Sequence, residues 1–306
     1  MQEVIITGAN SGLGWATAKH LLQQGYAVTL ACRNPAKAEA AKQKLETQTG
    51  SKNISYRQLD LASLKSMRDF VERTNGAPYG LICNAGIQYS QPTQYTKDGF
   101  ELTFGVNVLG HFLLTNLLLS KFRTLERIAV VSSAAHDPNT GGGRFGHPAF
   151  TTPELLAHVH DNPKADWNKL GNTRYVTSKL CALFFTYKLN LLLRSNNRSN
   201  VLVNAFNPGL LAGTGLGKNS APFTKFIWYY ILPAMAKFFK GSSTPDKSGL
   251  LLSKLITSVN ESGKYFSLGA AAVASSAESY DTNEMETFWQ GCEVLVGLGE
   301  NEKWYK

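Results

Sequence analysis

A glycine-rich stretch near the amino end reads Thr7-Gly8-Ala9-Asn10-Ser11-Gly12-Leu13-Gly14. It follows the short apolar run Val4-Ile5-Ile6 and leads into a helical pattern that ends near Gln24. Its three glycines lack Cβ atoms, which allows a tight turn, close approach of a pyrophosphate and close packing of helix on strand. The free N–H groups and positive dipole end of the helix favour an anion there. This glycine-rich turn therefore predicts a dinucleotide cradle made by Gly8, Asn10, Ser11, Gly12, Leu13 and Gly14.

Apolar runs typical of strands alternate with helical patterns from the amino end to about residue 207. The runs are unbroken rather than alternating with polar residues, which indicates a parallel sheet buried by helices on both faces. With right-handed crossovers this is a doubly wound α/β sheet, which binds ligands at the carboxyl ends of its strands. We expect further strands at 27–31, 54–59, 81–83, 128–131 and 201–205, and further helices at 35–47, 63–73, 100–122 and 175–194.

The composition is that of one large globular unit. Of the 306 residues, 43% are hydrophobic and 17% are charged, which supplies a large core and argues against disorder. No Pro/Gly/Ser-rich linker, internal repeat or low-complexity tract divides the chain. We therefore expect a single Rossmann-type domain over residues 1–306, with insertions at 137–172 and 211–248 that form the substrate pocket.

The net charge of +9 favours an anionic partner, such as a phosphorylated cofactor, an acidic substrate, a membrane surface or nucleic acid. The basic residues are spread along the chain without a Lys/Arg-rich run, so we do not expect nucleic-acid binding. The four cysteines are scattered without the spacing of a zinc site, which indicates a reducing compartment and no metal. Because a strand-like run begins almost at once, the sequence predicts a soluble, cytoplasmic protein without an N-terminal anchor.

The end of the second expected strand indicates which nicotinamide cofactor is bound. Enzymes that use NAD usually carry an acidic residue there, for the adenosine ribose hydroxyls. This chain has Cys32 followed by Arg33. A guanidinium can bind the 2′-phosphate of NADP, whereas a carboxylate would repel it. The sequence therefore predicts NADPH as the cofactor, with Arg33 at its phosphate; the alternative is that Arg33 is a solvated surface residue.

A tyrosine and a lysine four residues apart, Tyr175 and Lys179, lie on one face of an expected helix. A phenol is a poor acid or base at neutral pH, but a neighbouring ammonium lowers its pKa. Tyr175 can then exchange a proton with a carbonyl oxygen while a hydride is transferred. Ser133 follows the strand 128–131 and can hydrogen-bond to the same oxygen as charge develops on it, with Ser132 as the alternative.

The TGxxxGxG spacing and the sequence Tyr175-Val176-Thr177-Ser178-Lys179 together resemble the short-chain dehydrogenase/reductase family, over roughly residues 1–215 and more loosely beyond. The resemblance implies a nicotinamide-dependent oxidoreductase with Tyr175 as the acid/base. It also implies that Lys179 binds the nicotinamide ribose, and that Ser133 rather than Ser132 is the catalytic serine. Asn107 would hold a water in the proton relay to the lysine.

The same resemblance implies further contacts with the cofactor. Asp60-Leu61 is expected beside the adenine, and Pro208-Gly209 and Thr214 are expected beside the nicotinamide carboxamide. Asn84-Ala85-Gly86 resembles the family's Asn-Asn-Ala-Gly motif, with Cys83 in place of the first Asn. This turn would pack against the cofactor ribose; a purely structural role is the alternative.

Three stretches, at residues 31–34, 105–114 and 213–216, resemble the retinol dehydrogenases and the light-dependent protochlorophyllide reductases. The protochlorophyllide enzymes carry a Cys directly after the Pro-Gly, where this chain has Leu210. Animal retinol dehydrogenases often carry an N-terminal membrane anchor, which we do not expect here. Neither substrate is therefore assigned.

The segment 222–240 is aromatic, apolar and flanked by lysines. Its uninterrupted apolar part is too short for a membrane span, which needs about 20 residues. It is expected to cover an apolar pocket, or also to make peripheral contact with a membrane interface. Both alternatives favour a small-molecule substrate that is bulky and hydrophobic.

Two functions are consistent with these residues. One is an NADPH-dependent oxidoreductase that acts on a carbonyl or an alcohol; the other is a non-catalytic NADP(H)-binding sensor or interaction module on the same fold. Such a module would have lost part of the catalytic set. Because Asn107, Ser133, Tyr175 and Lys179 are all present, the sequence favours the enzyme.

Overall fold

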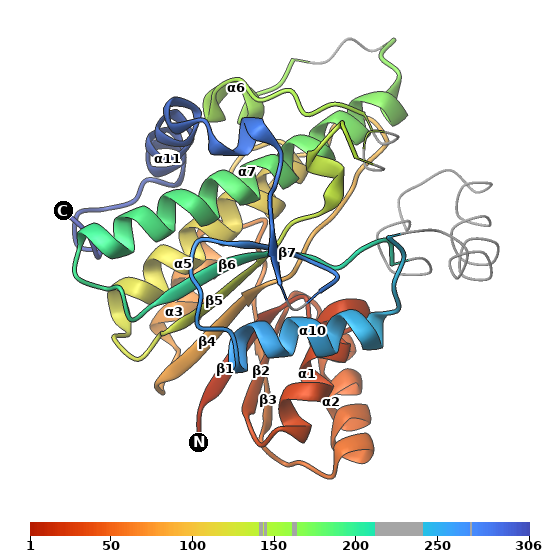
Figure 1. The fold of residues 1–306 in the computed structure, drawn as a ribbon, viewed down its shortest axis with the longest axis vertical. Coiled ribbons are helices and arrows are strands. Elements are labelled where there is room, and N and C mark those ends of the chain that lie inside the picture. The colour runs from red at the N-terminus through yellow and green to blue at the C-terminus, as the bar shows by residue number, and fades with distance from the viewer. Residues whose placement is uncertain (141–142, 144–145, 161–163, 212–240, 270) are drawn as a thin grey trace.

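The computed structural model describes residues 1–140, 143, 146–160, 164–211, 241–269 and 271–306. Its centre is an eight-stranded sheet with the order β3-β2-β1-β4-β5-β6-β7-β8 (Figure 1). The strands are β1 (Glu3–Thr7), β2 (Ala27–Cys32), β3 (Ile54–Gln58), β4 (Pro78–Cys83), β5 (Arg127–Val131), β6 (Leu202–Asn207), β7 (Tyr265–Ser267) and β8 (Ala272–Val273). Neighbouring strands are parallel except β7 and β8, which are antiparallel. The expected doubly wound α/β sheet is confirmed.

Both faces of the central strands are buried, because successive residues of a strand point to opposite faces. Val4 and Ile6 of β1 belong to one hydrophobic core, and Ile5 between them belongs to the other. In β4, Leu81 faces the second core and Ile82 faces the first. This two-sided burial is the reason why the strands appear in the sequence as unbroken apolar runs.

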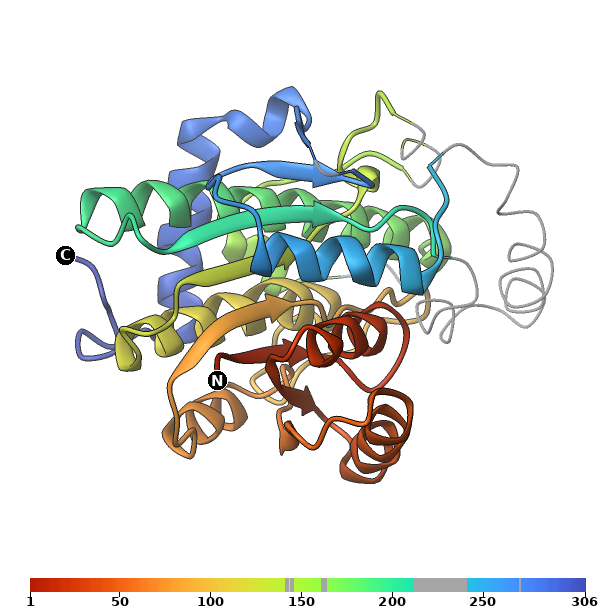
Figure 2. The same cartoon turned by 60° about the horizontal axis from the view of Figure 1, so that its bottom comes forward.

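Three helices cover one face of the sheet: α1 (Gly12–Gln23), α2 (Pro35–Thr49) and α10 (Pro245–Thr257) (Figures 1 and 2). The first turn of α2 contains Pro35, and Asn34 Oδ1 caps the helix by accepting a hydrogen bond from Lys37 N at 2.9 Å. Helix α10 lies directly on α1, where a Cβ atom at Gly249 would be only 2.8 Å from the carbonyl carbon of Ala16. A glycine is therefore needed for the two helices to pack this closely.

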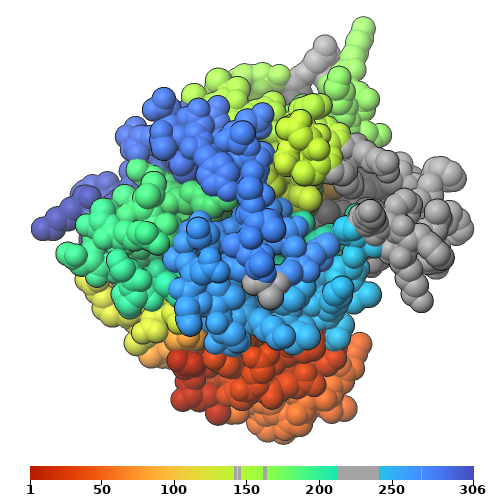
Figure 3. Space-filling view, in the orientation of Figure 1, coloured from red at the N-terminus to blue at the C-terminus, as the bar shows by residue number. Residues whose placement is uncertain are grey.

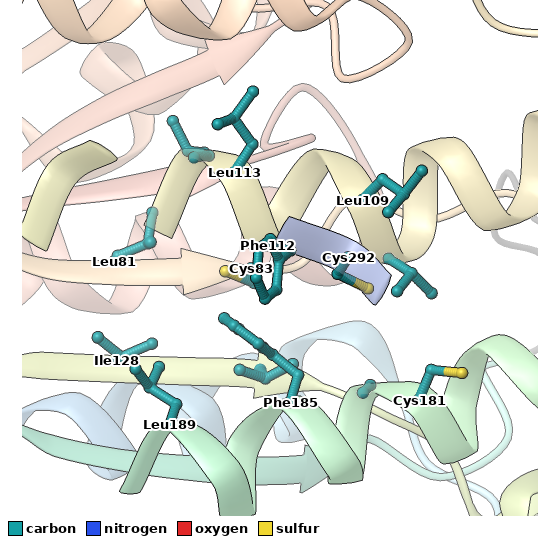
Figure 4. Close-up of a cluster of buried hydrophobic side chains, with 14 of the residues drawn as sticks. Leu81, Cys83, Leu109, Phe112, Leu113, Ile128, Cys181, Phe185, Leu189 and Cys292 are labelled. Atoms are coloured by element: carbon teal, nitrogen blue, oxygen red, sulfur yellow. The ribbon is translucent and has the colours of Figure 1, made fainter. Parts of the chain in front are cut away.

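The other face carries α3 (Leu64–Glu72), α5 (Gly110–Lys121) and α7 (Trp167–Ser195), with α11 (Thr282–Val296) packed against them. The ring of Phe112 on α5 has its centroid 4.8 Å from that of Trp289 on α11 and 5.9 Å from that of Phe185 on α7. Figure 4 shows Phe112 and Phe185 facing each other between their helices, with Cys292 of α11 beside them. This aromatic cluster joins three helices that are distant in the sequence.

The helix expected at 100–122 is divided into three pieces. A short helix α4 (Leu102–Phe104) is followed by a π-helical turn (Gly105–Leu109) and then by α5. Two glycines allow close packing here: a Cβ at Gly105 would lie 2.3 Å from the side chain of Thr96, and one at Gly110 would lie 2.9 Å from the carbonyl oxygen of Leu61. A π-helical turn of this kind within a helix is frequently found at a functional site.

Helix α7 begins at Trp167, eight residues before the expected start at 175. Asp166 caps it through Oδ1, which accepts hydrogen bonds from the N–H groups of Asn168 and Lys169. The expected insertion 137–172 therefore includes the first turns of α7 as well as α6 (Pro153–Ala157). Much of the other expected insertion, and with it the segment 222–240, lies outside the described residues.

The C-terminal part of the chain completes the helical layer. A space-filling view shows the blue C-terminal residues lying against the green surface of α7 (Figure 3). Two helical stretches, Leu102–Lys121 and Trp167–Ser195, are long and apolar enough to cross a membrane. Their most apolar windows are 89% and 78% buried inside the protein, so their apolar character is used in the core.

Candidate active site

The expected site residues lie at one edge of the sheet. Strands β1 to β6 are parallel, so their carboxyl ends meet at the same edge. The segments that follow these six strands carry the glycine-rich turn, Arg33, Asp60, Asn84-Ala85-Gly86, Ser133 and Pro208-Gly209, in that order. The sheet thereby brings together motifs that are up to 200 residues apart in the chain.

The glycine-rich turn has the geometry of an anion cradle. Gly8 and Gly12 have φ angles of +66° and +59°, which favour glycine. A Cβ atom at Gly8 would lie 3.0 Å from Ala85, and one at Gly14 would lie 2.6 Å from Asn84 Nδ2. Ser11 precedes α1 without capping it through its side chain, so the first N–H groups of the helix remain available. These features fit a dinucleotide phosphate.

The side chain of Thr7 ties this turn to the segment after β4. Its hydroxyl oxygen accepts hydrogen bonds from the N–H groups of Asn84 and Ala85, each at 2.9 Å. Asn84 Nδ2 returns a hydrogen bond to the carbonyl oxygen of Thr7 at 2.8 Å. A Cβ atom at Gly86 would lie 3.6 Å from Asn107 Oδ1 and 3.7 Å from Lys179 Nζ. The Asn-Ala-Gly turn thus has a structural role and also faces the side chains of Asn107 and Lys179.

Cys32 and Arg33 follow β2 but lie in different surroundings. The buried thiol of Cys32 accepts hydrogen bonds from the backbone of Ala9 and Asn10, and burial raises its pKa to about 11. Arg33 is exposed, and within the described part of the chain its guanidinium has no hydrogen-bond or ion-pair partner. A free guanidinium beside the glycine-rich turn fits a phosphate on the adenosine ribose.

Asp60 and Leu61 lie close to the next part of the edge. One carboxylate oxygen of Asp60 accepts a hydrogen bond from Ala62 N at 3.1 Å, and the other pairs with Lys97 Nζ at 3.1 Å. Leu61 is buried against Gly110 at the start of α5. The carboxylate of Asp60 is thus already paired with a cation, whose side chain is 69% exposed.

The expected proton-transfer group consists of Ser133, Tyr175 and Lys179, and these three residues lie close together. Tyr175 is 8% exposed, and the side chain of Ser133 is near enough to its hydroxyl to lower the pKa of the phenol. Ser132 is turned away, because its hydroxyl donates to the backbone carbonyl of Lys179 at 2.8 Å. The structure therefore pairs Tyr175 with Ser133 and gives Ser132 a different partner.

The structure differs from the expectation that Lys179 lowers the pKa of Tyr175. Burial raises the pKa of Tyr175 to about 12, against the smaller lowering effect of the Ser133 hydrogen bond. Lys179 Nζ lies 5.5 Å from the tyrosine ring centroid and donates to the carbonyl oxygen of Val131 at 3.0 Å. Burial also lowers the pKa of Lys179 to about 8. Desolvation therefore outweighs the attraction between the two groups in this arrangement.

Asn107 lies in the π-helical turn, and its side-chain amide uses nearly all of its hydrogen-bonding capacity. Its Oδ1 accepts from Ile87 N at 2.8 Å, and its Nδ2 donates to Ile87 O at 2.9 Å and to Ser178 Oγ at 3.0 Å. These bonds connect the turn after β4 with α7. The backbone carbonyl of Asn107 lies 3.2 Å from Nδ1 of His111.

The segment after β6 is held in a tight turn. Gly209 has a φ of +74°, and its N–H donates to Asn207 Oδ1 at 3.0 Å. The carbonyl oxygen of Pro208 accepts from Ser248 Oγ of α10 at 2.7 Å. Thr214, expected beside the carboxamide, lies outside the described residues.

Two residues at this edge are absent from the sequence-based site: Thr7 and His111. Thr7 is the first residue of the TGxxxGxG pattern, so the motif itself was a signal that could have identified it. His111 gave no comparable signal, because a histidine within an apolar helix is ordinarily interpreted as part of the core. Among the described residues no cluster of three or more His, Cys, Asp or Glu side chains could hold a metal ion.

Comparison with known proteins gives one consistent family. The family described as short chain dehydrogenase matches residues 2–144. Retinol dehydrogenase 13 of Mus musculus is 35% identical over 300 residues, which cover 96% of this chain and 84% of the mouse protein. The chloroplastic protochlorophyllide reductase of Daucus carota is 33% identical over 320 residues, which cover 96% of this chain and 78% of the carrot protein.

A solved structure supports the same relation over nearly the whole chain. The crystal structure of an uncharacterised protein from Mycobacterium paratuberculosis has a TM-score of 0.68 and 29% sequence identity. The match covers 97% of this chain and 94% of that one. It therefore includes the elements after β6 as well as the nucleotide-binding half.

Proposed function

Because the chain belongs to the short-chain dehydrogenase/reductase family, we propose that it is an NADPH-dependent oxidoreductase acting on a carbonyl or alcohol of a bulky hydrophobic substrate. The observation that carries this proposal is the buried Tyr175 hydroxyl, which lies beside Ser133 and one helical turn from Lys179. A bound nicotinamide cofactor would supply or accept the hydride. The relatives belong to the same oxidoreductase family. NADPH as the cofactor and a bulky hydrophobic substrate are what we propose for this chain.

The roles of the side chains follow from their surroundings. Since the pKa of Tyr175 is about 12, its hydroxyl is protonated at neutral pH and can donate to the oxygen of a carbonyl that is being reduced. Ser133 positions that oxygen through a second hydrogen bond. Lys179, with a pKa of about 8, is mostly protonated at neutral pH, and a water held at Asn107 would relay protons to it.

The cofactor-binding residues fit a phosphorylated dinucleotide. The glycine-rich turn and the uncapped start of α1 would hold the pyrophosphate, and the exposed Arg33 would hold the 2′-phosphate. Pro208-Gly209 and Thr214 would adjoin the carboxamide. The ion pair of Asp60 with Lys97 would lie beside the adenine.

The substrate class rests on two lines of support. The apolar segment 222–240 is expected to cover the pocket. The relatives are named for retinol and protochlorophyllide, which are both bulky and apolar. The alternative of a non-catalytic sensor is less favoured, because Asn107, Ser133, Tyr175 and Lys179 are retained and lie together around Gly86 and Val131.

The substitution Tyr175→Phe tests the catalytic proposal. NADPH consumption with a panel of aromatic and terpenoid carbonyls should fall by about 100-fold or more, because the proton donor is lost. NADPH affinity, measured by its fluorescence, should change little. Tyr187→Phe is a matched control on the same helix, since this buried tyrosine hydrogen-bonds to Ser275 and not to Ser133. Turnover of Tyr175→Phe within a few-fold of wild type would show that the phenol is not the acid.

The substitution Arg33→Asp tests the cofactor proposal. It replaces a free guanidinium with a carboxylate that repels the 2′-phosphate, so NADPH should bind at least about tenfold more weakly while NADH binds nearly as before. Fluorescence titration with each nucleotide gives both dissociation constants. Lys37→Asp, in the first turn of α2, is a control for a general change of surface charge. An equal loss of affinity for NADPH and NADH would show that Arg33 does not bind the 2′-phosphate.

A further inference from the structure

His111 is a buried histidine in the first turn of α5, one turn after Asn107, and only 4% of it is exposed. Each ring nitrogen has a partner. Nδ1 lies 3.2 Å from the carbonyl oxygen of Asn107, and Nε2 lies 3.0 Å from the hydroxyl oxygen of Thr7. The ring therefore bridges the glycine-rich turn and the π-helical turn.

The partners determine where the protons lie. A carbonyl oxygen only accepts, so Nδ1 carries the hydrogen that is donated to Asn107. Burial lowers the pKa of His111 to about 4, with a contribution from the positive charge of Lys179, so the ring is neutral at physiological pH. Nε2 is then an acceptor, and the Thr7 hydroxyl donates to it.

This assignment leaves Thr7 fully engaged. Its hydroxyl hydrogen is directed to His111, and its oxygen accepts the N–H groups of Asn84 and Ala85. The carbonyl oxygen of Ile82 is a more distant acceptor, at 3.3 Å. A continuous chain of hydrogen bonds thus runs from the turn after β4, through Thr7 and His111, to the backbone of Asn107.

The backbone carbonyl and the side chain of Asn107 have different partners, and His111 contacts the carbonyl. Its side-chain amide is already engaged with Ile87 and Ser178. In the π-helical turn the N–H of Gly110 bonds to the carbonyl of Gly105, five residues back, so the regular helical spacing is absent there. A carbonyl oxygen can accept two hydrogen bonds, so the bond from His111 does not by itself saturate that of Asn107.

We infer that His111 is a positioning residue that holds the Asn107 carbonyl and the Thr7 hydroxyl at a fixed separation, and so couples the nucleotide cradle to the proton relay. The inference rests on the proposed function. Its two hydrogen bonds have separate consequences. The bond from Nδ1 aligns the relay carbonyl and supports turnover, whereas the bond at Nε2 stabilises the cradle and supports nucleotide binding.

Two substitutions separate the two bonds. The side-chain nitrogen of asparagine can occupy the position of Nδ1, and the amide of glutamine can reach the position of Nε2. His111→Asn should therefore keep the donor to Asn107 and lose the contact with Thr7. His111→Gln should keep the contact with Thr7 and lose the donor to Asn107.

The expected result is a reciprocal pattern. His111→Asn should weaken NADPH binding by about fivefold, the effect of one hydrogen bond, with kcat at saturating NADPH near wild type. His111→Gln should bind NADPH normally and lose about fivefold or more in kcat. NADPH fluorescence gives the dissociation constants, and NADPH consumption gives kcat.

Asn116→Ala is the matched control, since Asn116 is buried on the same helix and accepts a hydrogen bond from Trp304 instead. It should lower Tm without producing either half of the pattern. A purely structural His111 would show the same lowering of both parameters in both variants, and that result would overturn the inference. Unchanged binding and kcat in both variants would overturn it equally.

Thr7→Val approaches the cradle contact from its other end. It should weaken NADPH binding at least as much as His111→Asn does. The double variant with both Thr7→Val and His111→Asn should bind NADPH no more weakly than Thr7→Val alone. Additive losses would contradict the bridge. If wild type reduces no carbonyl, the proposed function fails, while the NADPH dissociation constants of these variants still decide the coupling to the cradle.

Discussion

Tyr175 and Lys179 illustrate how burial controls proton chemistry at the scale of single residues. Desolvation disfavours the charged form of each group, so it raises the pKa of the phenol and lowers that of the ammonium. The charge of the lysine, which is what the sequence shows, acts in the opposite direction on the phenol. At neutral pH the phenol therefore remains protonated, and most of the lysine still carries its proton.

The lowered pKa of Lys179 predicts a pH dependence of stability. Between about 8 in the folded protein and 10.5 in the unfolded chain, the unfolded chain binds a proton that the folded protein does not, so stability rises with pH in this window. The free energy of unfolding of wild type minus that of Lys179→Met should increase by on the order of 2 kcal/mol from about pH 8 to about pH 10. Urea unfolding at each pH measures it.

The comparison with Lys179→Met also provides the control. Burial raises the pKa values of the four cysteines, so in this window their thiols ionise in the unfolded chain and not in the folded protein; both proteins share them, and their effect cancels in the difference. A difference that stays flat or decreases with pH would contradict a buried, easily deprotonated lysine.

At the scale of elements, close contacts between helices position the cradle. Helix α1 begins at the glycine-rich turn, and α10 holds it from outside through Gly249. The turn directly after β6 is connected to α10 as well, because the Ser248 hydroxyl of α10 donates to the carbonyl oxygen of Pro208. Helix α10 therefore links the two ends of the expected cofactor site.

Gly249→Leu tests this contact. The new side chain would meet the backbone of Ala16 at less than van der Waals distance, so it should destabilise the protein by about 1 to 3 kcal/mol and weaken NADPH binding by shifting α1. Chemical denaturation and NADPH titration provide the two readouts. Leu250→Ala, at the neighbouring exposed position, should change neither. Wild-type stability in Gly249→Leu would mean that the helices separate without cost.

At the scale of the whole molecule, α11 connects the C-terminus to the helices that carry the site. Trp289 of α11 is 2% exposed, contacts Phe112 of α5 and stacks on Phe185 of α7. Its indole N–H donates to Tyr305 near the chain end. The C-terminal elements thereby stabilise α7, which carries Tyr175, and α5, which directly follows the π-helical turn that carries Asn107.

Trp289→Ala should remove this support. Truncation of a buried aromatic side chain costs about 3 to 5 kcal/mol, which corresponds to a fall in Tm of roughly 10 °C. Val294→Ala on the same helix is the control, since Val294 is 78% exposed and should change stability by less than about 0.5 kcal/mol. Thermal unfolding followed by circular dichroism measures both. Equal Tm values for the two variants would mean that α11 is not part of the cooperative core.

Local patterns in the sequence determined the class of fold, the positions of β1 to β6 along the chain and the residues that line the carboxyl edge, because glycine spacing, apolar runs and a YxxxK helix are properties of neighbouring residues. Elements after Asn207 were not anticipated, since their patterns depend on packing against distant helices. The same reason explains the early start of α7, where Gly171 lies against the backbone of Tyr89.

Only the tertiary structure decided that Ser132 bonds to a backbone carbonyl, that burial rather than charge sets the pKa of Tyr175, and that His111 bridges Thr7 and Asn107. Each of these depends on which groups are brought together and on how much water is removed from them, and neither can be deduced from residues that are adjacent in the chain.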